Sequence, residues 1–284
     1  MSGPDRVVAM SMRDPWETGD AYEAYMGRWS RLVASRFVDW LAAPTGLNWL
    51  DVGCGSGALS EAIVTKSRPT HLIAIDQSDG FVRTAQRKLG ERACCKVADA
   101  LALPLADSSV DVAVSGLVLN FLPVPGKALA EMARVTAPGG TVAVYLWDYA
   151  GTMEFLRVFW GTVVELFPDA SDRHESVRFP ESNAEALERL LTHAGLADVE
   201  TAPIEIPTHF RNLDDYWEPF LGGQGPGPSF VASLAEPARK RLLTALTTRL
   251  PTQPDGSIPL SARAWAAKGR VGGEVLGNEK PSPS

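Results

Sequence analysis

The sequence predicts an α/β protein with a largely parallel sheet, and two observations carry this prediction. Short apolar runs alternate with segments of helical periodicity from about residue 47 to residue 148. These runs are apolar almost throughout, which is typical of strands that helices cover on both faces. The chain has 284 residues, of which 45% are hydrophobic. This is enough for one sizeable domain with an accessory element.

The elements follow one another in a regular order. Apolar residues at steps of three and four predict N-terminal lid helices over residues 20–43. Strands are then expected at 47–53, 70–78, 94–100, 110–116 and 141–148, with helices at 57–66, 80–90 and 125–137. The Pro-Gly-Gly at 138–140 reads as a turn that precedes the fifth strand.

Beyond residue 148 the alternation changes. Residues 152–167 are apolar nearly all round, so they predict a buried helix, and a capped helix follows at 182–195. A sixth strand is expected at 199–210, and a seventh, antiparallel strand at 257–271. The long connection at 208–256 predicts a helical cap inserted between strands 6 and 7, over the ligand end of the sheet.

Composition indicates where the folded domain begins and ends, and it argues against several classes of protein. We expect a flexible N-terminus at 1–19, one domain at 20–270 and a disordered tail at 271–284. A formal net charge of −7 argues against extended nucleic-acid binding, and no apolar run is long enough for a membrane span. Cys54, Cys94 and Cys95 form no C-x-x-C pair, so we expect no metal and a reduced, cytoplasmic protein.

Glycine and acidic residues mark the ends of three expected strands. Gly53 and Gly55 follow the first strand, where a backbone without Cβ atoms can lie close to a ligand. Asp76 ends the second strand and is placed to accept hydrogen bonds from ribose hydroxyls. Asp99 ends the third and is placed to accept from an adenine amine. Each residue alone has a structural reading as a turn or cap, but together they favour an adenosine cofactor.

Three kinds of cofactor fit a glycine loop of this type. A phosphate loop of the Walker type needs a lysine directly after its last glycine, and the next lysine is Lys66, so this alternative fails. The dinucleotide pattern G-x-G-x-x-A is met by Gly53, Gly55 and Ala58, with Asp76 about 20 residues on. A doubly wound NAD(P)-dependent oxidoreductase therefore stays open as an alternative, as does a cofactor-binding protein without catalysis.

The ordered set "LDVGCGSG", "AIDQS", "ADALALPLADSSVDVAVS" and "RVTAPGG" resembles the class I S-adenosylmethionine-dependent methyltransferases, in their small-molecule, methyltransferase type 11-like branch. The resemblance covers residues 20–148 closely. It implies a Rossmann-like sheet of seven strands in the order 3-2-1-4-5-7-6, with strand 7 antiparallel. It also implies S-adenosylmethionine as cofactor and S-adenosylhomocysteine as product.

The resemblance assigns cofactor contacts residue by residue, along the four motifs and the N-terminal "YMGRWSR". The implied contacts are Tyr25 and Arg28 in the closing N-terminal segment, Asp51, Gly53, Cys54 and Gly55 at the methionine part, Asp76 and Gln77 at the ribose, Asp99 and Ala100 at the adenine, and Ser115 beneath the cofactor. Arg28 would pair with the cofactor carboxylate.

The acceptor leaves weaker signals than the cofactor. Methylases that act on the amines of nucleic-acid bases resemble one another in an N-P-P-Y type motif after strand four. Here the corresponding segment reads "SGLVLN" and lacks that motif. We therefore expect a small-molecule acceptor, apolar or aromatic, and a monomer or homodimer. Candidate acceptor contacts are Trp147, Tyr216, Trp217 and Phe220, although such aromatics also serve to fix a cap to its neighbours. His209 is the first candidate general base and His174 the second.

Overall fold

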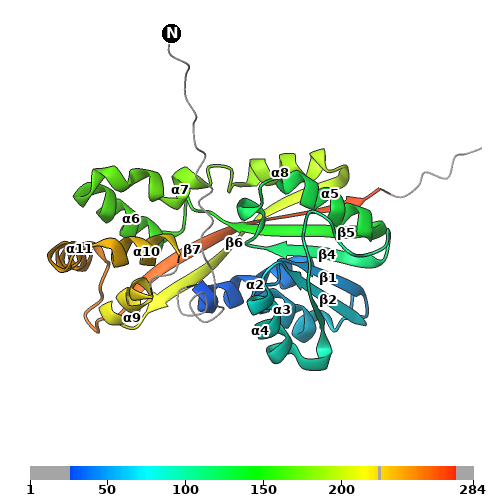
Figure 1. Ribbon diagram of the computed structural model, residues 1–284, viewed down its shortest axis with the longest axis horizontal. Helices are drawn as coiled ribbons and strands as arrows, with labels where there is room; N and C mark the ends of the chain where they lie inside the picture. Colours follow the sequence, from blue (N-terminus) through cyan, green and yellow to red (C-terminus); the bar gives the residue numbers. More distant parts are fainter. Residues whose placement is uncertain (1–25, 223–224, 273–284) are drawn as a thin grey trace, which may run out of the picture.

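One mixed sheet forms the centre of the molecule. The computed structural model describes residues 26–222 and 225–272 (Figure 1). The strands are β1 Asn48–Val52, β2 His71–Asp76, β3 Cys94–Val97, β4 Val110–Gly116, β5 Thr136–Trp147, β6 Leu196–Phe210 and β7 Ile258–Val271. They pair in the order β3-β2-β1-β4-β5-β7-β6. Strand β7 runs antiparallel to both of its neighbours, while the other pairs are parallel. The strand order and direction implied by the resemblance are confirmed.

Helices cover both faces of the sheet. They are α2 Arg28–Leu41, α3 Ala58–Ser67, α4 Asp79–Leu89, α5 Pro125–Val135, α6 Glu154–Leu166, α7 Glu175–Arg178, α8 Ala184–His193, α9 Leu213–Trp217, α10 Pro226–Ser233 and α11 Glu236–Arg249. Short 3-10 turns are η2 Gly90–Arg92, η3 Leu119–Phe121, η4 Pro168–Arg173 and η5 Glu218–Leu221. Helices α5 and α8 lie on one face, and α2, α3 and α4 on the other (Figure 1). Each face therefore buries its own apolar core.

The helices take their places because of their apolar stripes. In α2, Trp29, Val33, Phe37 and Leu41 are buried, which places one stripe of the helix against the sheet. The expected helical segment 20–43 is described only from residue 26. The expected N-terminal segment 1–19 and the tail from residue 273 onward lie outside the described residues.

The start of β5 differs from the expectation. The strand begins at Thr136, which pairs with Val110, and pairing resumes only at Thr141 with Val112. Pro-Gly-Gly therefore lies in an irregular stretch inside the strand, whereas the sequence predicted a turn before it. Gly139 has a φ of +78°. A Cβ at Gly140 would lie 2.6 Å from the carbonyl oxygen of Asp111, so only glycine fits this close approach.

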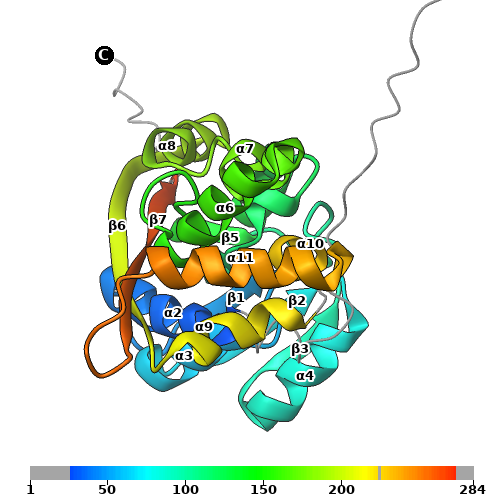
Figure 2. The same ribbon diagram turned by 90° about the vertical axis from the view of Figure 1, so that its left-hand side faces the viewer.

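Two sets of helices gather at the carboxyl ends of the strands. One set, α6, η4 and α7, follows β5, and the other, α9, η5, α10 and α11, connects β6 to β7. Seen toward the strand ends, α11 crosses in front of the sheet (Figure 2). The α6 residues Phe159 and Trp160 are fully buried and contact Phe220 and Phe230 of the second set. These aromatic contacts join the two sets into one cap over the strand ends.

Candidate functional site

The loop after β1 is folded tightly against β2 and leaves space on its outer side. The backbone amides of Gly53 and Cys54 both donate to the carbonyl oxygen of Ile75, each at 2.8 Å. Gly53 has a φ of +75°, and a Cβ there would lie 2.5 Å from Val118. At Gly55, with a φ of +52°, a Cβ would meet nothing within 4 Å. The loop is therefore packed at Gly53 and open at Gly55, as a site for a close-lying ligand requires.

Asp51 lies buried beneath this loop. Its Oδ2 accepts a hydrogen bond of 2.6 Å from the Ser60 hydroxyl, and its Oδ1 has no partner among the described residues. Burial raises the pKa of the Asp51 carboxyl to about 7, against the lowering effect of the Ser60 hydrogen bond. A buried polar atom without a partner is unusual in a folded protein. Asp51 thus presents unused hydrogen-bonding capacity at the base of the glycine loop.

Asp76 connects the glycine loop to the next turn. Its Oδ2 accepts from the amide of Gly55 at 3.0 Å, and its Oδ1 accepts from the amide of Ser78 at 2.8 Å. Burial raises the pKa of Asp76 above its usual value, although these hydrogen bonds act in the opposite direction. A carboxylate has about four acceptor sites, so Asp76 keeps capacity for a further donor beyond the backbone amides that it already accepts from.

The other predicted cofactor residues lie at the ends of neighbouring strands. Asp99 is exposed and accepts from the amide of Leu101 at 2.8 Å, while Ala100 beside it is buried. Gln77 is exposed directly after β2. Ser115, near the end of β4, is buried, and its hydroxyl has no partner in the described part of the chain. Because β1 pairs with β2 and β4, and β2 with β3, all these positions share one edge of the sheet.

Arg28 is held by the cap. Its Nη1 donates to both carboxylate oxygens of Asp215, at 3.1 and 3.2 Å. Its guanidinium also lies over the rings of Trp29 and Phe210, at 4.3 and 4.6 Å from their centres. Burial opposes the charge on Asp215, but hydrogen bonds from Arg211 and Arg28 outweigh it and hold the pKa of that carboxyl below its usual value. The expected pairing of Arg28 with a cofactor carboxylate stays a prediction, and Tyr25 lies outside the described residues.

The predicted acceptor aromatics are part of the packed interior. Tyr216 is fully buried, and its hydroxyl donates to the carbonyl oxygen of Phe155 at 2.8 Å. Phe220 stacks on Phe159 with ring centres 4.1 Å apart. Trp217 and Trp147, at the end of β5, are also buried. In this arrangement the aromatics fix α9 and η5 to α6, and an acceptor contact by any of them stays a prediction.

The two histidines proposed as bases have different surroundings. His209 is exposed near the end of β6, whereas its neighbours Thr208 and Phe210 are buried, so its side chain faces the other way. His174 is half-buried, and burial lowers its pKa. Its Nδ1 accepts from the amide of Ser176 at 3.0 Å, and its ring centre lies 6.1 Å from that of Trp160. A catalytic role for either stays a prediction.

The segment after β4 contains features that the motif reading missed. Leu117 has a φ of +63°, which is strained for a leucine, and its amide donates to the carbonyl oxygen of Tyr145. The next residue, Val118, lies against Gly53. The signal available in the sequence was "SGLVLN", an apolar stretch directly after a strand end, but nothing local showed that it turns toward the glycine loop.

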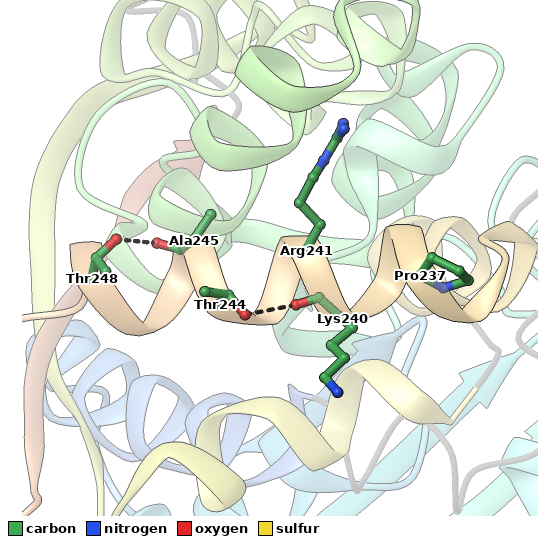
Figure 3. A pocket seen from close by; sticks show the side chains of 6 residues that line it. All are labelled: Pro237, Lys240, Arg241, Thr244, Ala245 and Thr248. Carbon is green, nitrogen blue, oxygen red and sulfur yellow. Dashed lines mark hydrogen bonds between the residues drawn. The ribbon is translucent and has the colours of Figure 1, made fainter.

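A hollow on α11 lies apart from all of these residues. It has a volume of about 560 Å³ and is lined by Pro237, Lys240, Arg241, Thr244, Ala245 and Thr248. Figure 3 shows these side chains along one helix, with Arg241 and Lys240 pointing to opposite sides. Arg241 donates to the carbonyl oxygen of Leu166 at 3.0 Å, a contact that fixes α11 to the end of α6. None of the predicted site residues lines this hollow.

Among the described residues we find neither a metal site nor a helix that could span a membrane. In that part of the chain, no group of three histidine, cysteine, aspartate or glutamate side chains is placed to hold a metal ion. None of the helices within residues 26–222 and 225–272 has the length and apolar character that crossing a membrane requires.

Comparison with known proteins points in one direction. A family model described as a methyltransferase domain matches residues 50–144. The chain is 34% identical to demethylmenaquinone methyltransferase of Renibacterium salmoninarum over 149 residues, 52% of this chain and 60% of that protein. It is also 34% identical to malonyl-[acyl-carrier protein] O-methyltransferase of Dechloromonas aromatica over 175 residues, 61% of this chain and 59% of that protein. The chain thus spans about six tenths of the length of these curated relatives.

Solved structures show the same fold. The YcgJ protein of Bacillus subtilis is similar with a TM-score of 0.54 at 17% identity, covering 84% of this chain and 98% of that one. Phosphoethanolamine N-methyltransferase 2 of Haemonchus contortus, solved with S-adenosyl-L-methionine, is similar with a TM-score of 0.54 at 17% identity, covering 89% of this chain and 56% of that one.

Proposed function

Because the chain belongs to the class I S-adenosylmethionine-dependent methyltransferases, we propose that it transfers a methyl group from S-adenosylmethionine to a small-molecule acceptor. The observation that carries this proposal is the glycine loop. It has free space at Gly55, and the Gly55 amide donates a hydrogen bond to the Asp76 carboxylate. The relatives and structures reported above give no support to the oxidoreductase alternative.

The residues present fit the cofactor. Asp51 Oδ1 and Ser115 Oγ are buried without partners among the described residues, so each can bond a ligand at no loss of an existing contact. Open space at Gly55 allows backbone approach. We propose that Asp51, Gly53, Cys54 and Gly55 hold the methionine part, that Asp76 and Gln77 hold the ribose, and that Asp99 and Ala100 frame the adenine. Ser115 would lie beneath the cofactor.

The cofactor supplies a methyl group already activated by a positive sulfur. An acceptor lone pair forms the new bond to the methyl carbon while the carbon–sulfur bond breaks, with its electron pair remaining on sulfur. The protein's part is to align the acceptor and exclude water, and the cap of aromatic contacts over the strand ends suits that task. A base is needed only where the acceptor loses a proton, and we propose His209 for that role.

The acceptor is proposed to be apolar or aromatic. The first curated relative is named for demethylmenaquinone and the second for the malonyl group of an acyl-carrier protein, and these names suggest candidate acceptors without assigning one. We further propose that the protein acts in the cytoplasm as a monomer or homodimer. Its three free cysteines support a reducing location.

Ligand-induced stabilisation tests the cofactor. At about 100 times the dissociation constant, S-adenosylhomocysteine should stabilise the protein by about 2.7 kcal/mol and raise Tm by about 5 °C or more. NADH and NADPH at equal concentration should leave Tm unchanged. Stabilisation by the nicotinamide cofactors alone would contradict the proposal and restore the oxidoreductase reading.

A further inference from the structure

A second pocket lies beside the cofactor residues, between the segment after β4 and the segment before α8. It has a volume of about 220 Å³. Its lining includes Leu119, Asn120, Leu146, Arg178, Ser182 and Leu190. Apolar side chains form most of the wall, and the polar ones come from only a few positions. Such a composition is typical of sites for small organic molecules.

The pocket is connected to the glycine loop through a short segment. Strained Leu117 redirects the chain at the end of β4, and Val118 then packs against Gly53. The next two residues, Leu119 and Asn120, line the pocket. The same turn therefore contacts the proposed cofactor loop on one side and the pocket on the other. Strained residues gather at functional sites, where neighbouring contacts hold them in place.

Two buried polar groups in the wall have unused capacity. Ser182 is only 4% exposed, and its hydroxyl has no hydrogen-bond partner among the described residues. The amide nitrogen of Asn120 is likewise buried without a partner in the described part of the chain. Both groups donate hydrogen bonds, so they match a ligand that presents acceptor oxygens. Most buried polar groups in folded proteins have a hydrogen-bond partner, so these two donors are candidates for contact with a ligand.

A cation stands in the same wall. Arg178 contributes to the lining, and its guanidinium lies 5.0 Å from the ring centre of Phe179. That ring is held between Phe121 and Tyr149, at 5.2 and 5.4 Å. The acid in the lining, Glu181, is exposed and lies 4.0 Å from Arg189 outside the pocket. The pocket wall thus holds an arginine as well as the two donors, and a guanidinium is suited to binding an anionic ligand group.

From these contacts we infer that this pocket binds the methyl acceptor, and that the acceptor carries a carboxylate on a compact apolar body. The carboxylate oxygens accept from Asn120 and Ser182 beside the Arg178 guanidinium. Leu119, Leu146 and Leu190 surround the apolar part. The word acceptor rests on the proposed function, whereas the binding of an apolar carboxylate does not.

Calorimetric titration of the full chain with octanoate tests this inference. Its neutral isostere octanamide serves as the matched probe, and each titration is run with and without S-adenosylhomocysteine. We expect one saturable octanoate site in the wild type and at least tenfold weaker binding of octanamide. Arg178→Gln should lower the affinity for octanoate at least tenfold and leave the affinity for octanamide within twofold of the wild-type value. Ser182→Ala and Asn120→Leu should each lower the affinity for both probes several-fold.

Matched variants separate a binding role from a loss of fold. Arg173→Gln removes an arginine that lies over the Phe230 ring, in the same cap but outside the pocket lining, and should bind octanoate like the wild type. Arg178→Lys keeps the charge and should bind octanoate better than Arg178→Gln. Equal octanoate affinity in wild type and Arg178→Gln, or no saturable binding to the wild type, would overturn the inference. Failure of S-adenosylhomocysteine to bind while octanoate binds would instead count against the proposed methyl transfer.

Discussion

The guanidinium of Arg28 and the carboxylate of Asp215 form a two-point ion pair, with Nη1 at 3.1 and 3.2 Å from the two carboxylate oxygens. The pair joins α2 to α9 across 187 residues of sequence. Asp215 is nearly buried and also accepts from the amide of Arg211 at 2.9 Å. This contact fixes the cap to the N-terminal helix beside the sheet.

Removing the carboxylate should loosen this connection. Asp215→Asn leaves Arg28 without its ionic partner and should lower the free energy of unfolding by about 1.5–3 kcal/mol, the range for hydrogen bonds to charged groups. The folded-state pKa of Asp215 is depressed, so its contribution is present above the unfolded pKa of about 3.8 and is lost as pH falls below it. Thermal melting of both proteins between pH 3 and pH 7 checks this. A constant difference across that range would contradict it.

The buried Asp51 should give the opposite pH dependence. Its folded-state pKa is about 7, against an ordinary value of 3.8 for an aspartate, so between these two pH values the folded protein holds a proton that the unfolded chain has lost. Stability therefore falls as pH rises from about 4 to about 7. Asp51→Asn should remove a penalty of about 4 kcal/mol at pH 8 and almost none at pH 4.

Melting curves of Asp51→Asn across this pH range provide the measurement. The exposed Asp169 offers a matched control, because Asp169→Asn should melt like the wild type at every pH. The account would be contradicted if the stability difference between the wild type and Asp51→Asn were the same at pH 4 and at pH 8. The Asp51 carboxyl would then be ionised in the folded protein already at acidic pH.

Tyr216 offers a test of packing against acceptor binding. Tyr216→Phe removes the hydroxyl that donates to Phe155 and leaves a buried carbonyl without that donor, which should cost about 1–3 kcal/mol. A purely packing role predicts this loss in denaturant unfolding with unchanged KM for the acceptor. An increase in KM of tenfold or more would assign the Tyr216 hydroxyl to acceptor binding.

His209 can be tested by the pH profile of kcat. Its side chain is exposed and faces away from buried Phe210. If His209 is the base, as proposed, His209→Asn should lower kcat about 100-fold or more and alter its profile between pH 6 and pH 9. A kcat within a few-fold of wild type across that range would remove His209 from the mechanism.

Much of the fold could be predicted because its signals are local. The strand order was implied by the family resemblance and is confirmed. The local signals are the apolar runs and the glycine and acid pattern at the strand ends, which led to Gly53, Asp76 and Asp99 on one edge of the sheet. A strand or a glycine-rich turn can be recognised from only a few consecutive residues. The irregular start of β5 was missed, because Pro-Gly-Gly has the same appearance in a turn and in a bulge.

The contacts that long-range packing decides could not be predicted. Arg28 and Asp215 are separated by 187 residues, and Tyr216 and Phe155 by 61. No local periodicity indicates which distant group a side chain will meet. The same holds for Asn120 and Ser182, which line one pocket although Asn120 lies in η3 and Ser182 between α7 and α8. The residues proposed for the acceptor are therefore harder to predict from sequence than those proposed for the cofactor.

Calorimetric titration with S-adenosylhomocysteine tests the central claim most directly. The claim is that Asp76, through its remaining acceptor sites at the glycine loop, holds the ribose of the cofactor. The wild type and Asp169→Asn should bind one equivalent with equal affinity. Asp76→Asn should bind at least tenfold more weakly, because it loses hydrogen bonds to a charged acceptor worth about 1.5–3 kcal/mol each. Equal affinity in all three proteins, or no saturable binding to the wild type, would contradict the account.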